Sequence, residues 1–234
     1  MNQHKIRKFK GGVIGMWLGD ACFAKAKEGK NVSVRITHSI KQAEYAKFKA
    51  DYLSALTKVK VTEVKCGGYD CITVSTRIHP LYTQLKERSK QFAKFVKRLT
   101  DEGLAFWYMD DGSICFSKSY NKHHVYRISS RRISLHTEGF TLEENQILRD
   151  LIEDRFSVKF NVSKKGQYWK LSCGTEEAKK LFKIITPYII PSMKYKLNLR
   201  YVDSCDVPLS NQSDEIVRPV WRHTELCRNA VAVA

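Results

Sequence analysis

Two short apolar segments of the chain each end in an acidic residue, and their similarity constrains the fold more than any other feature. The segments are GVIGMWLGDA, residues 12–21, and GLAFWYMDDG, residues 103–112. Each begins at a glycine, continues through apolar side chains and closes on an acid, so that Asp20 aligns with Asp111. Because an internal repeat governs the whole topology, the chain is predicted to fold as two similar halves.

The stretches after each acid correspond in the same order. In VSVRIT, which follows the first acid, Val32 and Ile36 share one face of a predicted strand. The matching stretch of the second half slips its alternation near Ser129 and Ser130, which indicates a β-bulge. Each half is therefore predicted to continue from its apolar helix into a pair of strands.

A second helix, two more strands and a closing helix complete each half. Ser39 with Gln42, and Thr141 with Glu144, fit the capping box that begins a helix. Short strands are predicted around VTEVK and CITVST in the first half and around KFNVS and YWKLS in the second. The predicted fold class is α+β, with two αββαββα halves at residues 1–98 and 99–200 and a C-terminal extension at 201–234.

One face of each predicted antiparallel sheet must be covered by the helices, which leaves the other face open. In the second half, alternation places polar side chains on the open face; these are Lys159, Asn161, Ser163, Tyr168 and Lys170. Lysine and arginine outnumber aspartate and glutamate 41 to 24, for a net charge of +17. This charge favours a polyanion such as nucleic acid, and a β-ribbon can lie in a DNA major groove. The alternative is an ordinary solvated sheet face.

The two apolar segments are predicted to be buried helices that pack against each other, with Gly15 and Gly19 leaving little bulk along one edge. Their C-terminal ends then bring Asp20 and Asp111 together where the helix dipoles are already negative, an arrangement that costs stability. A bound Mg²⁺, which prefers oxygen ligands, reverses that cost. The alternative, that Asp111-Gly112 is only a turn, does not explain why both copies carry the acid.

VIGMWLGDA at 13–21 and LAFWYMDDG at 104–112 resemble the two motifs of single-chain LAGLIDADG homing endonucleases. HTEGFTLEEN at 136–145 and PYIIPSMKYKL at 187–197 resemble the branch that includes the yeast mitochondrial omega intron endonuclease. The resemblance covers roughly residues 10 to 200. It implies paired motif helices at the interface of two pseudo-symmetric halves, with saddle-shaped sheets on DNA.

The resemblance also implies an activity and a set of site residues. Family members bind a long asymmetric double-stranded target and cut both strands across the minor groove with divalent metal, leaving short 3′ overhangs. By position, the metal-binding acids are Asp20 and Asp111; Asp110 is accessory, and the main-chain carbonyls of Gly19 and Asp110 contribute ligands. Expected DNA contacts beyond the open-face residues named above are Lys25, Lys27, Arg35, Lys118, Arg127 and Arg131.

The family further places a basic residue near each scissile phosphate. Lys196 matches in the second half. In the first half the match is Lys90, with Arg88 and Lys86 as alternatives, and solvated surface charge is the competing explanation for each. A branch member has glutamine where this chain has Glu138.

The function expected from the sequence is that of a monomeric DNA endonuclease using Mg²⁺, encoded within an intron or other mobile element. The alternatives are an intron maturase that binds RNA with the same fold and a DNA-binding regulator that does not cleave. Seven scattered cysteines and the absence of a long apolar run favour a soluble intracellular protein, in an organelle or a bacterial or phage-host cytoplasm.

Overall fold

The structure is a computed structural model that describes residues 2–25, 31–120 and 126–197; of 117–120 and 126–131 only the backbone is described. The first half comprises α1 (Gln3–Leu18), β1 (Ala21–Lys25), β2 (Val32–Ser39), the 3₁₀ turn η1 (Ile40–Gln42), α2 (Ala43–Ser54), β3 (Val59–Cys66), β4 (Tyr69–Thr76), α3 (Pro80–Ser89) and α4 (Phe92–Val96). The second comprises α5 (Asp101–Asp111), β5 (Gly112–Tyr120), β6 (Tyr126–Leu135), α6 (Leu142–Phe156), β7 (Asn161–Lys165), β8 (Tyr168–Gly174), α7 (Thr175–Ile185), and the 3₁₀ segments η2 (Thr186–Tyr188) and η3 (Pro191–Leu197).

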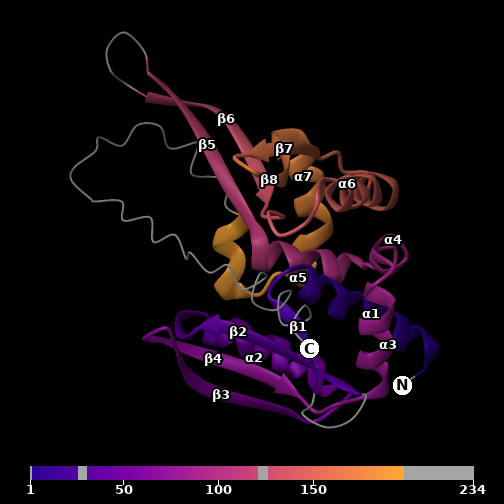
Figure 1. Ribbon diagram of the computed structural model, residues 1–234. Helices are drawn as coiled ribbons and strands as arrows, with labels where there is room; N and C mark the ends of the chain where they lie inside the picture. The colour runs from indigo at the N-terminus through magenta and orange to yellow at the C-terminus, as the bar shows by residue number, and fades with distance from the viewer. Residues whose placement is uncertain (1, 26–30, 121–125, 198–234) are drawn as a thin grey trace.

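The two halves have the same topology. Each contains a four-stranded antiparallel sheet, in the order β1-β2-β4-β3 in the first half and β5-β6-β8-β7 in the second. Figure 1 shows the two sheets on opposite sides of the molecule, with α1 and α5 between them. The predicted αββαββα halves and the α+β fold class are confirmed, with the additional short helix α4 joining them.

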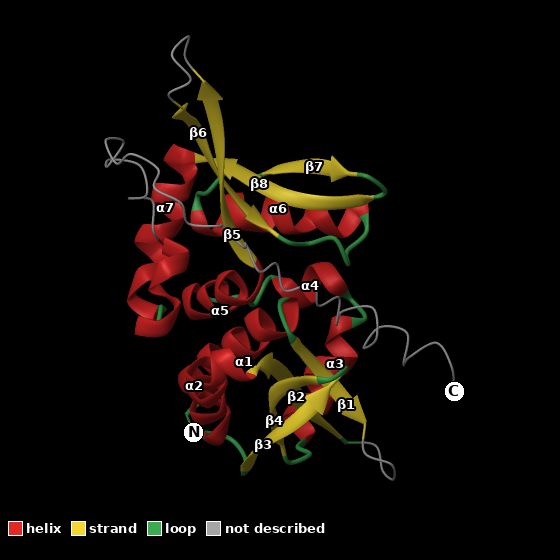
Figure 2. Ribbon diagram, turned by 90° about the vertical axis from the view of Figure 1, so that its left-hand side faces the viewer, coloured by secondary structure: helices red, strands yellow, loops and turns green. Residues whose placement is uncertain are grey.

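Helices α1 and α5 lie side by side at the centre of the molecule (Figure 2). A Cβ atom on Gly15 would collide with the main chain of Gly103, and one on Gly103 would collide with the carbonyl of Gly11. The absence of side chains at these points allows the two backbones to touch. Both helices are buried because apolar residues cover all of their sides. In α1 the buried residues include Val13, Ile14, Met16 and Leu18, and in α5 they run from Leu104 to Met109.

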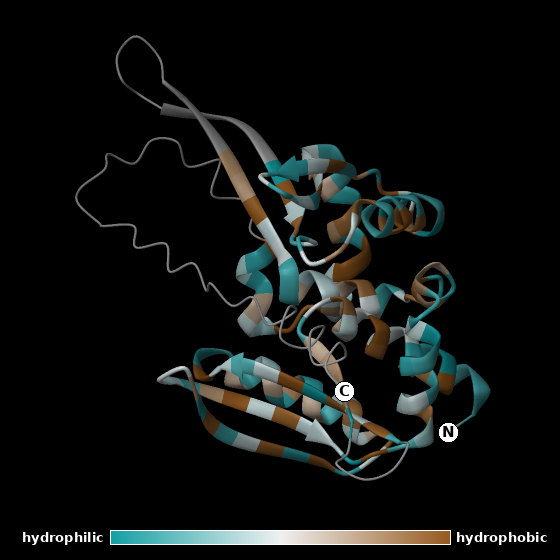
Figure 3. Cartoon of the chain, viewed as in Figure 1, coloured by the Kyte–Doolittle hydropathy of each residue, from teal (hydrophilic) through white to brown (hydrophobic). Residues whose placement is uncertain are grey.

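Alternation along the strands separates a helix-covered face from an open face. Val32, Val34 and Ile36 are each at most 2% exposed and face the helices, as predicted. Figure 3 shows the resulting alternation of apolar and polar residues along the first sheet. On the open face, the hydroxyls of Thr37 and Thr73 lie 3.1 Å apart across β2 and β4.

Of the local features predicted at the strand and helix ends, the capping box and the bulge of the second half are present, and the capping box of the first half is not. Thr141 and Glu144 form the predicted capping box at the start of α6. Pairing of β5 with β6 shifts register between Ser117 and Lys118, which leaves Ser129 as the extra residue of the predicted bulge. The capping box predicted for Ser39 was wrong, because Ser39 instead caps the 3₁₀ turn η1 and α2 begins without a side-chain cap.

Candidate active site

The acidic ends of the two motif copies meet where α1 and α5 end. Asp20 follows the C-cap of α1 at Gly19, and Asp110 and Asp111 are the last residues of α5. The main-chain N–H of Asp20 donates to Oδ2 of Asp110 at 3.2 Å, which ties the two helix ends together. The side chain of Asp20 keeps 36% of its surface exposed, whereas that of Asp110 has none.

Two first-half residues, Lys49 of α2 and His38 of β2, complete the buried side of the site. The ammonium of Lys49 lies 2.6 Å from Oδ1 of Asp110 and 3.1 Å from Nε2 of His38. Because the ammonium can only donate, Nε2 of His38 accepts and the ring proton lies on Nδ1, 3.5 Å from Oδ2 of Asp20. Burial, with the Lys49 charge beside it, lowers the pKa of His38 to about 3, so the ring is neutral.

Lys196, from the C-terminal segment η3, reaches the same helix end. Its ammonium donates to the main-chain carbonyl of Asp110 at 3.0 Å and to that of Met109. The carbonyl of Lys196 in turn accepts from the hydroxyl of Tyr108 at 2.8 Å. Burial lowers the pKa of Lys196 despite the neighbouring carboxylates. The Asp110 carbonyl, predicted as a metal ligand, therefore already accepts a hydrogen bond from the chain.

The carboxylates at this junction repel one another in poorly solvated surroundings. Although 36% of the Asp20 side chain stays exposed, the dense protein around it, and then the charge of Asp110, raises its pKa to about 7, with Lys49 and Lys196 opposing the rise. The pKa of Asp111 is raised by burial and then by the charge of Asp20. Because the charge of Asp20 acts on Asp111, the two aligned acids are neighbours at this junction, as the repeat predicts.

The acidic side chains suit a hard divalent cation. Oxygens of Asp20 and Asp110 and a ring nitrogen of His38 lie within 4.8 Å of one another. Of these, the Asp20 carboxylate is the accessible one, and Asp111 lies beside it. A cation among these oxygens would offset the repulsion that adds to the effect of burial on both pKa values, so the donor set fits Mg²⁺ or Mn²⁺.

The structure does not bring the predicted first-half basic residue into this cluster. Lys90 follows the end of α3, where its ammonium pairs with Glu87 and its side chain is 68% exposed. Lys86 and Arg88, the alternatives, lie in the last turn of the same helix. In the described part of the first half, it is the ammonium of Lys49 that contacts the cluster, through Asp110, so a role for Lys90 stays a prediction.

Several predicted contact residues lie on the open faces. In the first sheet Arg35 is exposed and lies beside Ser75 of β4. In the second, β7 and β8 place matching residues opposite one another, with Asn161 opposite Ser172 and Ser163 opposite Lys170. Tyr168 lies on the same face by alternation. Of these residues, Ser172 is buried, whereas Arg35, Asn161, Ser163, Tyr168 and Lys170 are exposed or half-buried on the open faces; their contact with DNA stays a prediction.

Two other predicted contacts lie elsewhere. Lys159 precedes β7, and its ammonium is 3.5 Å from Glu153 of α6, on the helix-covered side; the predicted open-face placement is wrong because the strand begins two residues later. Lys25, at the end of β1, is opposite Val32 and lies close enough for its charge to lower the pKa of Lys86. Lys27, the side chains of Lys118, Arg127 and Arg131, and residues 201–234 lie outside the described part of the chain.

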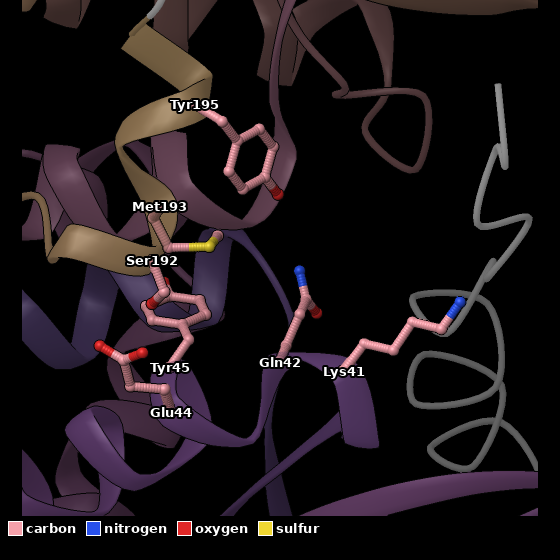
Figure 4. A pocket seen from close by; sticks show the side chains of 7 residues that line it. All are labelled: Lys41, Gln42, Glu44, Tyr45, Ser192, Met193 and Tyr195. Carbon is pink, nitrogen blue, oxygen red and sulfur yellow. The ribbon is translucent and has the colours of Figure 1, made fainter. Parts of the chain in front are cut away.

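Next to Lys196, a pocket of about 230 Å³ separates the start of α2 from η3 (Figure 4). Gln42, Tyr45 and Tyr195 line it together with Lys41, Glu44, Ser192 and Met193. Gln42 lies close enough to both His38 and Tyr195 to influence the pKa of each, so this wall of the pocket connects the η3 segment to the buried side of the acid cluster. None of the described helices is long and apolar enough to cross a membrane.

Sequence reasoning missed Lys49 and His38. Lys49 lies four residues after Tyr45 and four before Leu53, both buried, so a lysine interrupts the apolar stripe of α2. His38 likewise continues the buried alternation of Val34 and Ile36. A charged or titratable residue on a core-facing stripe was the available signal.

Comparison with known proteins agrees with this geometry. The profile of the LAGLIDADG DNA endonuclease family matches residues 11–181. An uncharacterised protein of Methanocaldococcus jannaschii is 30% identical over 199 residues, 79% of this chain and 71% of that protein. A probable intron-encoded DNA endonuclease of Mycosarcoma maydis is 34% identical over 102 residues, 44% of this chain and 66% of that protein.

RecA of Mycobacterium gastri is 26% identical over 196 residues; the match covers 81% of this chain but only 46% of RecA, so the chain spans about half of that relative. Among solved structures, the homing endonuclease I-WcaI bound to its DNA recognition sequence shares the fold with a TM-score of 0.65, at 23% identity, over 82% of this chain and 86% of that one. With a profile match across most of both halves and two acid-ended helices paired at the centre, this chain belongs to the LAGLIDADG DNA endonuclease family.

Proposed function

We propose that the chain is a metal-dependent, sequence-specific DNA endonuclease that cuts both strands of a long asymmetric site and leaves short 3′ overhangs. The observation that carries this proposal is the convergence of Asp20 and Asp111, one from each half, at the ends of paired buried helices. Two acids at a pseudo-twofold junction suit two phosphodiesters on opposite strands. Since one chain supplies both acids, a monomer would suffice.

The open faces of the two sheets are proposed to hold the duplex. Arg35 in the first half and Lys170 in the second offer charges to phosphates, and Asn161 and Ser163 offer groups that can bond base edges. The net charge of +17 favours association with a polyanion. The relative from Mycosarcoma maydis, named as a probable intron-encoded DNA endonuclease, supports DNA as the partner.

The carboxylates of Asp20 and Asp111 would hold Mg²⁺, with the carbonyl of Gly19 as a further oxygen. When bound, the cation polarises the phosphodiester and lowers the pKa of the attacking water. Asp20 must be ionised to bind it, and since the pKa of this group is about 7 without metal, binding would release a proton near neutral pH. Lys196 is proposed to stabilise charge or exchange a proton at the second-half centre, and the lowering of its pKa by burial supports this role.

The test is cleavage of plasmid DNA carrying a site selected from a randomised library in the presence of Mg²⁺. The wild-type chain should linearise the plasmid, and chelator should stop it. Asp20→Asn and Asp111→Asn should each lower the rate of double-strand cleavage by at least about 100-fold while target binding persists. Asp154→Asn, an exposed acid on α6, is the matched control and should cut normally.

Cleavage by the Asp20 or Asp111 variant at the wild-type rate would refute the assignment of the acids. Binding of a selected DNA site without cleavage under any divalent metal would favour the alternative of a non-cleaving regulator. Preferential binding of the host intron RNA would favour the maturase alternative.

A further inference from the structure

We propose that Asp110 and Lys49 act as a positioning pair that holds the main chain at Asp20, and that the Asp110 carboxylate is not itself a metal ligand. The inference rests on the proposed function of Asp20. It concerns the acid cluster of Asp20, Asp110 and His38, where proximity alone would suit a cation.

Both oxygens of Asp110 are already engaged by the chain. Oδ1 lies 2.6 Å from the ammonium of Lys49, and Oδ2 accepts from the N–H of Asp20 at 3.2 Å. Neither the Asp110 nor the Lys49 side chain has any exposed surface. If either oxygen of Asp110 turned toward a cation, it would lose its contact with Lys49 or with the N–H of Asp20.

Lys49 makes such a turn costly. Among the residues that the structure describes, its other contacts are with neutral groups, Nε2 of His38 at 3.1 Å and the ring of Tyr45 at 4.4 Å from the centroid. Asp110 is therefore the counter-ion that compensates a fully buried positive charge. Removing one partner of a buried ion pair is strongly unfavourable because the other charge stays uncompensated.

The pair acts on Asp20 through the main chain. Gly19 has no side chain at the point where Asp110 approaches, and a Cβ there would collide with the Asp110 carboxylate. The contact fixes the residue just after the end of α1, while the Asp20 carboxylate remains 36% exposed. Asp20 is thus held by its backbone and keeps its oxygens free.

The second half supports its acid differently. The carbonyl of Asp111 accepts from the N–H of His136, the residue directly after β6. On α6, the helix corresponding to α2, the buried residues include Asn145 but no charged side chain. The buried ion pair therefore serves the first-half acid.

Two double substitutions test the proposal without leaving an unpaired buried charge. Asp110→Asn with Lys49→Met keeps an oxygen that can accept from Asp20, and Asp110→Ala with Lys49→Met removes it. The measurements are the affinity for Mn²⁺ alone by electron paramagnetic resonance, kcat for cleavage, and Kd for target DNA in chelator. Asp20→Asn is the reference for loss of the ligand itself.

The affinity of the asparagine variant for Mn²⁺ should stay within about threefold of the wild-type value. The affinity of the alanine variant should fall by about tenfold, as it does when a group that hydrogen-bonds a metal ligand is removed. The alanine variant should also lose about tenfold or more in kcat with DNA Kd nearly unchanged, and the asparagine variant should restore most of that loss.

A loss of Mn²⁺ affinity in the asparagine variant equal to that in Asp20→Asn would show that Asp110 is a ligand. That measurement decides the question even if the alanine variant does not fold. Wild-type kcat in the alanine variant would refute the positioning role. Undiminished cleavage by Asp20→Asn would instead overturn the proposed function, so the two failures are distinguishable.

Discussion

The ammonium of Lys49 lies 2.6 Å from the carboxylate of Asp110, and neither side chain reaches solvent. This contact joins α2 to the end of α5 and so connects the covering helices of the first half to the paired central helices. It also means that the negative charge gathered at the two helix ends is partly balanced by the chain itself, by Lys49 on one side and Lys196 on the other. A cation bound by the carboxylates of Asp20 and Asp111 would therefore join negative charges that Lys49 and Lys196 already balance in part.

The close approach of α1 and α5 should make Gly15 intolerant of a side chain. Gly15→Ser would push a Cβ into the main chain of Gly103, and overpacking of this kind costs about 1–3 kcal/mol. Gly174→Ser is the matched control, because nothing lies within 4 Å of a Cβ there and serine favours the N-cap of α7. Denaturant unfolding should show a clearly lower free energy of unfolding for Gly15→Ser and an unchanged one for Gly174→Ser. Equal stability of the two would contradict backbone contact between the helices.

The overall topology was predictable from the sequence because the repeat is carried by local patterns. Two apolar segments ending in Asp20 and Asp111, with the strand and helix patterns after each, determine the order of elements. The glycine edge of α1 further indicated the helix that it packs against. Such features depend on residues near one another in the chain, where periodicity is informative.

The contacts inside the site were not predictable in the same way. Lys49 and Asp110 are separated by 61 residues, and whether they meet depends on how α2 packs on α5. The predicted position of Lys159 was wrong for a related reason. Alternation assigned it to the open face, but its strand begins later and Glu153 of the neighbouring helix attracts its ammonium.

The stability of the metal-free protein should depend on pH through Asp20. Its pKa is raised from 3.8 to about 7 in the folded state, so the folded protein binds the extra proton and this contribution is lost as the pH rises between those values. His38 has the opposite effect, because its pKa is lowered from 6.5 to about 3 and its contribution is lost as the pH falls.

Because the wild type and Asp20→Asn both contain His38, the difference in stability between them cancels the contribution of His38. In chelator, the Tm of wild type relative to the variant should fall between about pH 5 and about pH 8, and saturating Mn²⁺ should reverse the fall. An identical difference in Tm at both pH values would show that Asp20 is not destabilised by its surroundings.

Lys196 should matter to the cleavage step more than to DNA affinity. Lys196→Met removes the ammonium that bonds the carbonyls at the end of α5 and that is proposed to act near a phosphate, so kcat should fall by roughly 100-fold. Lys194→Met, an exposed lysine of the same segment η3, is the control and should leave kcat unchanged. Single-turnover cleavage and DNA Kd measured on both variants separate the two effects. Equal kcat values for the two variants would remove Lys196 from the chemistry.

Salt dependence should separate two lysines that the sequence alone treats as equivalent. Lys170 lies on the open face opposite Ser163, whereas Lys159 pairs with Glu153 on the helix side. If Lys170 meets a phosphate, Lys170→Ala should lower the slope of log Kd against log salt by about 0.9, because one contact releases about that many counterions. Lys159→Ala should leave the slope unchanged, and both can be measured by fluorescence anisotropy across a salt series. A reduced slope for Lys159→Ala alone would place the DNA on the helix-covered side and contradict the open-face arrangement.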